Sequence, residues 1–423
     1  MSIKVFAKNL RNLLLQPPIR DKMIMGIDPG YRSGCKVAVI DQTGKYLAGD
    51  NIYPHPPQNK IFESKTTLRQ FIDKYKVDII AIGNGTASRE TESLVADLIR
   101  EIKEAVNKEV FYLIVNEAGA SVYSASKIAK EEFPELDASM RGNISIARRL
   151  LDPLAELVKI DPKHIGVGMY QHDISQNKLN EALGKVIESA VNLVGVDLNT
   201  ASGSLLQNVS GLTAASAKNI VEYRDENGKF KTCEKLKKIK GIGEMAFEQS
   251  AGFLRISDGD NPLDNTGIHP ESYEATKRLF EIVGVGENPE EWRTMKNEIK
   301  LNPAELAEKV GVGEPTLNDI LLNLEKPGRD PRDEMPKPVF KSDVMSIEDL
   351  RDGMVLKGTV RNVVDFGAFV DIGVKHDGLV HISNMSEKYI KNPLDIVSVG
   401  DIISVKILGI DPERGRINLS MII

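Results

Sequence analysis

Hydrophobic positions follow three different patterns along the chain. From residue 23 to about residue 160, short apolar runs such as Met23–Ile27 and Val77–Ile82 alternate with longer segments that repeat apolar residues at helical spacing. Residues 175–324 keep the helical spacing almost throughout, and the C-terminal residues alternate apolar and polar positions between Gly-bearing turns. These patterns predict buried strands with helices, then helices alone, then short antiparallel strands.

We therefore expect a multidomain protein with an α/β domain of element order βββαβαβα, an all-α region and a small all-β barrel. A chain of 423 residues is long enough for about three domains. The expected boundaries are a lead-in over 1–22, the α/β domain over 23–165, two helical hairpins over 175–258, a helical spacer over 259–325, a Pro-rich linker over 326–344 and the barrel over 345–423.

Composition narrows the class of protein only slightly. The net charge is −6, so any binding of nucleic acid would depend on local basic patches. Two cysteines and six scattered histidines form neither a disulfide framework nor a zinc-ligand spacing, and we interpret the pair His172-Asp173 as structural. No apolar run approaches the roughly 20 residues of a spanning helix, and residues 1–22 lack the apolar centre of a signal peptide. We expect a cytoplasmic protein without metal, cofactor or membrane partner.

The expected barrel carries two phenylalanines, Phe366 and Phe369, three residues apart. In a regular strand they would point to opposite faces, so a bulge at Gly367 would be needed to bring both rings to the outer surface. Exposed rings beside basic side chains let unpaired bases stack, which contributes roughly 1–3 kcal/mol per base. The alternative is that both rings belong to the core and that His381 only closes a turn.

The barrel region resembles the S1 motif, an OB-fold that binds RNA. The strings that carry this resemblance are Gly358-Thr359-Val360, Asp365-Phe366-Gly367-Ala368-Phe369-Val370-Asp371-Ile372, Asp377-Gly378-Leu379-Val380-His381-Ile382-Ser383 and Arg416-Ile417-Asn418-Leu419-Ser420. The resemblance implies that Phe366, Phe369, His381 and Arg416 bind RNA by stacking and by phosphate contact.

Two glycine turns, at Gly211 and Gly241, lie thirty residues apart, and each precedes an amphipathic helix, expected to end at Arg224 and Arg255 respectively. Each turn resembles a helix-hairpin-helix, which implies contact between backbone amides and a phosphate without reading of sequence. The second turn keeps both Gly241 and Gly243, whereas the first has Thr in place of its second glycine. The alternative is that each glycine only caps a helix. The densest basic stretch of the chain lies between the turns and consists of Lys229, Lys231, Lys235, Lys237, Lys238 and Lys240.

Asp28-Pro29-Gly30 after the first strand resembles the opening of ribonuclease-H-like domains of the YqgF branch. In nucleases of that class carboxylates hold two divalent ions, which implies Asp28, Glu117 and Asp152 as candidates for Mg²⁺ or Mn²⁺ binding, with Asp152 on a helix over 144–158. Gly83-Asn84-Gly85 stands where those nucleases often have an acid. We therefore favour a domain that docks nucleic acid or protein without hydrolysis. Asp28 could also be a turn residue, and Asp152-Pro153 could begin a helix.

In this order the domains resemble the Tex family of transcription accessory proteins. Further strings in this resemblance are 26–30 (GIDPG), 81–91 (AIGNGTASRET), 116–124 (NEAGASVYS) and 152–162 (DPLAELVKIDP). Members of that family are longer, so the chain is expected to be their C-terminal portion. The resemblance implies a nucleic-acid-binding transcription accessory factor, with RNA polymerase or the elongation machinery as partner. We expect it to bind single-stranded RNA through the barrel and DNA backbone through the hairpins. The alternatives are a metal-dependent structure-specific nuclease and a ribosome-associated RNA-binding factor.

Overall fold

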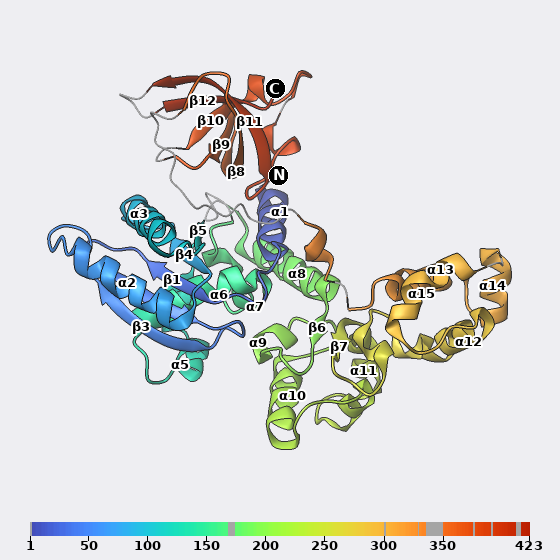
Figure 1. Cartoon of the computed structure of the whole chain (residues 1–423). Coiled ribbons are helices and arrows are strands. Elements are labelled where there is room, and N and C mark those ends of the chain that lie inside the picture. The colour runs from blue at the N-terminus through green and yellow to red at the C-terminus, as the bar shows by residue number, and fades with distance from the viewer. Residues whose placement is uncertain are drawn as a thin grey trace. The chain divides into compact units, whose positions relative to one another are not determined.

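The computed structural model describes residues 2–167, 174–299, 302–328, 330–335, 350–374, 377–390, 392–411 and 416–423 (Figure 1). The chain divides into two compact units, of which residues 1–183 with 335–423 form one and residues 184–334 form the other. His172, Asp173 and residues 336–344 of the expected linker lie outside the described residues. No helix in the described part of the chain is long and apolar enough to cross a membrane.

The first unit contains a five-stranded sheet with the strand order β3-β2-β1-β4-β5. Strand β2 is antiparallel to both of its neighbours, whereas β1, β4 and β5 run parallel. The carboxyl ends of the three parallel strands therefore meet at one edge of the sheet. The elements are α1 (Ser2–Leu14), β1 (Ile24–Asp28), β2 (Cys35–Ile40), β3 (Tyr46–Ile52), α2 (Ile61–Tyr75), β4 (Ile79–Gly83), α3 (Ser88–Val106), β5 (Phe111–Val115), α4 (Ala120–Ala125), α5 (Lys127–Glu132), α6 (Ala138–Leu151) and α7 (Pro153–Leu157).

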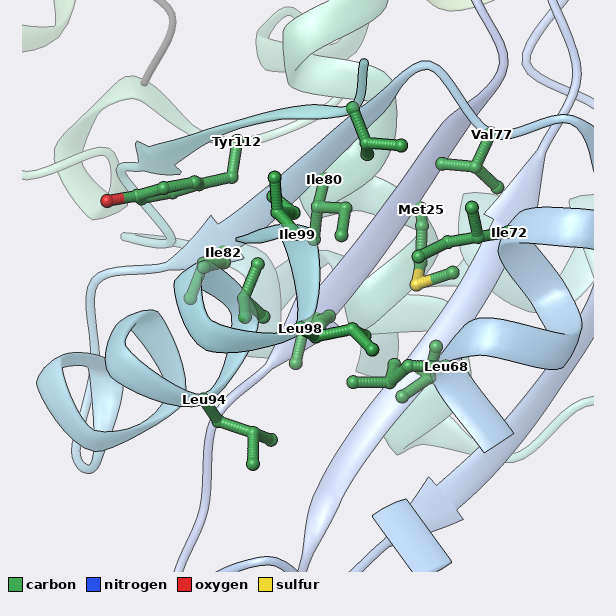
Figure 2. Packing of buried hydrophobic residues seen from close by; sticks show 14 of the residues in the cluster. Met25, Leu68, Ile72, Val77, Ile80, Ile82, Leu94, Leu98, Ile99 and Tyr112 are labelled. Carbon is green, nitrogen blue, oxygen red and sulfur yellow. The ribbon is translucent and has the colours of Figure 1, made fainter. Parts of the chain in front are cut away.

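Helices cover both faces of this sheet. On one face Met25 of β1 belongs to the same core cluster as Leu68 of α2 and Leu98 of α3 (Figure 2). On the other face Ile24 packs in a cluster with Ile144 of α6. Neighbouring residues of one strand thus supply two different cores, because side chains alternate across the sheet. The central strand β4 is apolar and buried along its whole length, as expected for a strand that is covered on both faces, whereas the edge strand β3 carries the exposed Asp50 and Asn51.

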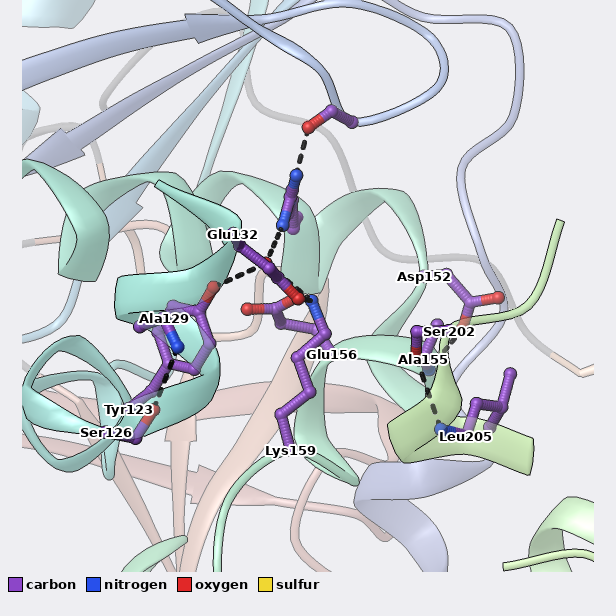
Figure 3. Close-up of polar contacts among 12 residues, drawn as sticks. Tyr123, Ser126, Ala129, Glu132, Asp152, Ala155, Glu156, Lys159, Ser202 and Leu205 are labelled. Carbon is purple, nitrogen blue, oxygen red and sulfur yellow. Dashed lines mark hydrogen bonds and ion pairs between the residues drawn. The ribbon is translucent and has the colours of Figure 1, made fainter. Parts of the chain in front are cut away.

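Glu132, the last residue of α5, is the centre of a polar network (Figure 3). Its carboxylate accepts a hydrogen bond from the Tyr123 hydroxyl at 2.7 Å and forms ion pairs with Arg148 at 2.7 Å and Lys159 at 2.9 Å. Lys159 is also paired with buried Glu156 at 2.9 Å. Burial alone would raise the pKa of Glu132, but Lys159, Tyr123 and Arg148 lower it overall. Through Tyr123, Glu132 and Arg148 the network links α4 and α5 to α6.

The second unit is helical, as predicted, apart from one short parallel pair of strands, β6 and β7. The helix after Gly243 is shorter than predicted, because it ends at Ser250 and the chain then forms β7. Trp292 is buried, stacks on Phe280 with ring centroids 5.2 Å apart and donates its indole N–H to the Gly286 carbonyl at 2.9 Å. The elements are α8 (Gln176–Val194), which begins in the first unit, β6 (Val196–Asp197), α9 (Gly203–Leu206), α10 (Ala214–Asn227), α11 (Glu244–Ser250), β7 (Leu254–Arg255), α12 (Tyr273–Val283), α13 (Pro289–Glu298), α14 (Pro303–Val310) and α15 (Glu314–Glu325).

The C-terminal strands close into a barrel with the order β10-β12-β11-β8-β9. Their side chains alternate between a buried core, which includes Val360, Val370 and Leu419, and the outer surface. The sheet domain, the helical region and the barrel confirm the predicted fold class. The strands are β8 (Val355–Val364), β9 (Gly367–Asp371), β10 (Gly378–His381), β11 (Ile402–Asp411) and β12 (Arg416–Ser420).

Replacing Glu132 with Gln should destabilise the first unit by about 2 kcal/mol near neutral pH, because buried Lys159 and half-buried Arg148 would lose their shared, half-buried partner. The folded-state pKa of Glu132 is lowered, so its stabilising effect is complete above the unfolded-state pKa and is lost as pH falls through the folded-state value. The difference between Glu132→Gln and wild type should therefore shrink on acidification. Hydrogen exchange of α5 and α6 in both proteins at several pH values measures this difference in stability.

Glu131→Gln is the matched control on the same helix. Its carboxylate is 65% exposed and forms only a surface pair with Lys127 at 3.5 Å, so little change is expected. An equal effect of the two substitutions, or a Glu132→Gln effect that does not depend on pH, would show that the ionised Glu132 carboxylate does not stabilise the first unit.

Candidate nucleic-acid interface

The turn before β9 brings the two phenylalanines of the barrel together. Gly367 has φ +155°, and a Cβ atom there would collide with the Val380 carbonyl of β10, so only glycine allows this close approach. The Phe366 carbonyl accepts the Ile382 amide at 2.9 Å, which ties the turn to the end of β10. The rings of Phe366 and Phe369 then lie edge to face, with centroids 6.3 Å apart and an interplanar angle of 85°.

Both rings reach the outer surface of the barrel. Phe366 is 50% exposed, and Phe369 is half-buried between Ala368 and Val370, which point into the core. The predicted bulge at Gly367 is wrong, because Gly367 pairs with Val364 in regular register. The register shift lies in β8 between Val360 and Asn362, and Phe366 precedes the strand, so strand alternation does not constrain it.

His381 lies beside this aromatic pair. It is directly opposite Gly367 in the β9–β10 ladder and is exposed. Its Nδ1 accepts the Ser383 backbone amide at 3.3 Å, so in the neutral ring Nε2 carries the proton. That N–H is available as a donor to a phosphate or to a base edge.

Arg416 is exposed on the same outer wall but is not adjacent to His381. Leu379 pairs with Phe369 on one side and with Asn418 on the other, which places Asn418 level with the aromatic pair. Since β10 and β12 are parallel, His381 is two residues beyond that level and Arg416 two residues before it, a separation of about 13 Å along the strands. The sequence motif did not single out Asn418, because only the strand register shows which residues flank Phe369.

The second hairpin turn is open to solvent. Gly241 has φ +88°, and Lys240, Gly241 and Gly243 are all exposed. Gly243 begins α11 without a side-chain cap, and a Cβ atom added to it would meet nothing within 4 Å. The first turn differs, because a Cβ atom on Gly211 would lie 2.7 Å from Gln249 of α11.

Two further turns of the same kind lie in the segment that was expected to be a spacer. Gly284-Val285-Gly286-Glu287 and Gly311-Val312-Gly313-Glu314 repeat the pattern of Gly241-Ile242-Gly243-Glu244. Gly284 and Gly311 also have positive φ, +79° and +84°. The Gly286 amide already donates to Glu291 at 3.0 Å. A search for the repeated Gly-x-Gly-Glu string would have found both turns from the sequence.

At the carboxyl edge of the sheet, Asp28 and Glu117 approach each other. The Glu117 carboxylate fills the space where Gly83 and Gly85 have no side chains, and its amide donates to Asn84 Oδ1 at 3.0 Å. Burial raises the pKa of Asp28. Burial, followed by the charge of Asp28, also raises the pKa of Glu117.

Asp152 does not join this pair. The predicted helix over 144–158 is interrupted at Asp152, whose side chain accepts the Ala155 amide at 3.1 Å and caps α7. This arrangement matches the alternative in which Asp152-Pro153 begins a helix. Within the described residues, no group of three or more His, Cys, Asp or Glu side chains is arranged to hold a metal ion.

Arg149 of α6 is buried behind the carboxylate pair. Its Nη1 donates to the carbonyls of Asn116 and Ala118, at 2.6 and 2.8 Å. Burial lowers the pKa of Arg149 to about 10, although Glu156 and Glu117 oppose the shift. Arg149 thus fixes the loop after β5 and with it the backbone of Glu117.

An α/β domain, a series of glycine-turn helical hairpins and a barrel with exposed aromatic rings define a multidomain nucleic-acid-binding protein. Residues 22–151 match the Tex protein YqgF-like domain, 191–255 the helix-hairpin-helix motif, 261–332 the HHH domain and 349–422 the S1 RNA binding domain. The HHH match covers most of the expected spacer together with its two glycine turns.

Three relatives match almost the whole chain. "Uncharacterized protein YdcI" of Bacillus subtilis is 54% identical over 422 residues, which is 100% of this chain and 58% of the relative. "Protein tex" of Bordetella pertussis is 51% identical and "Transcriptional accessory protein Tex" of Neisseria gonorrhoeae 49%, each over 99% of this chain and 52% and 54% of the relative. The chain belongs to the family of Tex transcription accessory proteins and spans about half the length of these relatives.

Asp28→Asn should lower the pKa of Glu117, because removal of the neighbouring negative charge favours the ionised carboxylate. Carbon-detected NMR titration of the Glu117 carboxyl in both proteins measures the shift. Asp152→Asn is the matched control, and it should leave the Glu117 titration unchanged. An unchanged Glu117 titration in Asp28→Asn would show that the two carboxylates do not interact.

Proposed function

We propose that the protein is a transcription accessory factor that binds single-stranded RNA through its S1 barrel and nucleic-acid backbone through its helical hairpins. The observation that carries the proposal is the edge-to-face pair of exposed Phe366 and half-buried Phe369 on the outer surface of the barrel, beside exposed His381. Every base has an aromatic face, so such a surface binds unpaired nucleotides with little dependence on sequence.

The edge-to-face geometry supports binding of more than one nucleotide. Two rings at 85° cannot stack on the same base, so Phe366 and Phe369 offer faces to different bases. His381 lies within the same patch and supplies a donor for the intervening phosphate or a base edge. Asn418, level with Phe369, adds an exposed amide on the outer wall.

The hairpins add contacts that do not depend on unpaired bases. Exposed backbone amides and lysines at a glycine turn suit a phosphate of single or double strands. Two modest sites in one chain can raise the overall affinity for a ligand that reaches both. DNA backbone is therefore the second proposed ligand.

The Neisseria gonorrhoeae relative is named "Transcriptional accessory protein Tex", which supports a role in transcription. We accordingly propose RNA polymerase or the elongation machinery as the partner and the cytoplasm as the place of action. We assign docking rather than hydrolysis to the YqgF-like domain. The support is that Asp152 caps a helix instead of completing a group of carboxylates with Asp28 and Glu117.

Phe366→Ala should weaken binding of single-stranded RNA by about 5- to 150-fold, the equivalent of roughly 1–3 kcal/mol for one stacked base. Fluorescence anisotropy with a labelled unstructured RNA measures the affinity of the full chain. Phe62→Ala removes an aromatic ring that is 81% exposed on α2, and it should leave the affinity unchanged. Equal affinities of the two variants would refute RNA stacking on the barrel.

RNA affinity should also fall with salt, because phosphate contacts release counterions. In a plot of log affinity against log salt, each phosphate contact on a single strand adds about −0.7 to the slope. The same anisotropy titration at four or five salt concentrations gives this slope. A flat response would mean that no phosphate is contacted.

A further inference from the structure

We infer that only one of the two turns in the tandem hairpin domain, Lys240–Gly243, contacts the nucleic-acid backbone, and that Asn219 of the first hairpin holds this turn in its binding geometry. The inference rests on the proposed function, because it assigns the backbone contact to particular residues. The two turns look alike in sequence, but their amides and surroundings differ.

The amides on either side of Gly211 in the first turn are already used within the protein. The Ser210 amide donates to Asn192 Oδ1 of α8 at 3.2 Å, and the Thr213 amide donates to Ser216 Oγ at 2.8 Å. The Ser216 amide in turn donates to Thr213 Oγ1 at 3.2 Å, which completes a capping box at the start of α10. A phosphate at this turn would have to displace these partners.

The first turn is also packed and lies beside a negative charge. A Cβ atom on Gly211 would lie 2.7 Å from Gln249 Cβ and 3.0 Å from the Ala246 carbonyl, so the turn lies against α11. The Ser210 hydroxyl donates to the Glu188 carboxylate at 2.5 Å. That carboxylate would repel a phosphate at the same place. The first turn is therefore a packing element.

The second turn has the opposite properties. Lys240, Gly241 and Gly243 are exposed, no side chain caps Gly243, and open space surrounds it. Lys238 is also exposed, and neither it nor Lys240 forms an ion pair with the described part of the chain. At the second turn, exposed lysines thus lie beside a helix start that has no side-chain cap.

Asn219 of α10 fixes the direction of the second turn. Its Nδ2 donates to the Lys240 carbonyl at 2.7 Å. In a trans peptide unit the carbonyl and the following N–H point in opposite directions, so a Lys240 carbonyl directed at α10 turns the Gly241 N–H away from it. The Ile242 amide is used internally, with the Ile239 carbonyl at 3.1 Å. Asn219 thereby makes the Gly241 amide available to a ligand.

Each hairpin supports the other in a different way. The turn of the first hairpin packs on α11 of the second, and α10 of the first holds the carbonyl of the second turn. Because only the turn Lys240–Gly243 contacts phosphate, the domain binds the phosphodiester backbone of one strand. A second strand is not required for the contact.

Aspartate substitution at the two helix starts tests the inference on the full chain with a short duplex DNA. Thr213 and Gly243 both have extended backbone before the first helical residue, with φ −115° and −84°, and Asp is a favourable residue at such positions. Gly243→Asp should weaken binding about tenfold or more and reduce the salt slope by about 1. Thr213→Asp adds the same charge at the first turn and should change the affinity less than about twofold.

Asn219→Ala should also reduce both the affinity for duplex DNA and the salt slope, while RNA binding by the barrel stays at the wild-type value. Asn227→Ala on the same helix is the control, because Asn227 only donates to the Tyr223 carbonyl within α10 at 3.0 Å. Loss of RNA binding together with DNA binding in Asn219→Ala would indicate general unfolding and would overturn the positioning role.

The outcomes separate the inference from the proposed function. If wild type binds the duplex and Thr213→Asp weakens it as much as Gly243→Asp, both turns contact backbone and the inference fails alone. If wild type binds and neither Asp variant weakens it, neither turn is the contact. If wild type shows no salt-dependent binding of duplex DNA, the backbone part of the proposed function fails with it.

Discussion

The requirement that backbone N–H and carbonyl groups find partners governs much of this molecule. In the closed barrel each described strand pairs with a neighbour on both sides, and in the open sheet the three inner strands do so. At the first hairpin turn, side chains of α8 and α10 accept the amides of Ser210 and Thr213. The exposed second turn departs from this rule, because its first helical turn has no side-chain cap. Backbone groups left to solvent or to a ligand thus lie near the positive charge of Lys238 and Lys240.

Much of the architecture could be predicted from the sequence, because periodicity records which face of an element is buried. The strand–helix order, the helical region and the barrel follow from that signal, and the motif strings around Phe366 and His381 located the aromatic patch. The break at Asp152 has a local cause, because Pro153 begins a new helix and Asp152 caps it, and the sequence already offered this as an alternative. The position of the bulge could not be predicted, because it depends on the pairing of β8 with β9, which local sequence does not determine.

The difference between Gly211 and Gly241 shows the same limit. Both have positive φ, +84° and +88°, so local sequence reasoning treats them as equivalent turns. What separates them is supplied by α11 on one side and by Asn192 and Glu188 of α8 on the other. Likewise, the place of Glu117 depends on two glycines more than thirty residues earlier, whose missing side chains leave room for its carboxylate. A chemical motif therefore shows what a residue can do, and packing decides whether it is free to do so.

Trp292 is the one tryptophan of the chain, and it lies sealed against Phe280 inside the helical region that matches the HHH domain. Its indole emission consequently reports the environment of that region alone, whatever the sheet domain and the barrel do. The intrinsic fluorescence of Trp292 can therefore be used to follow the thermal unfolding of this region without any label. Far-ultraviolet circular dichroism, which averages over all domains, would supply the complementary signal.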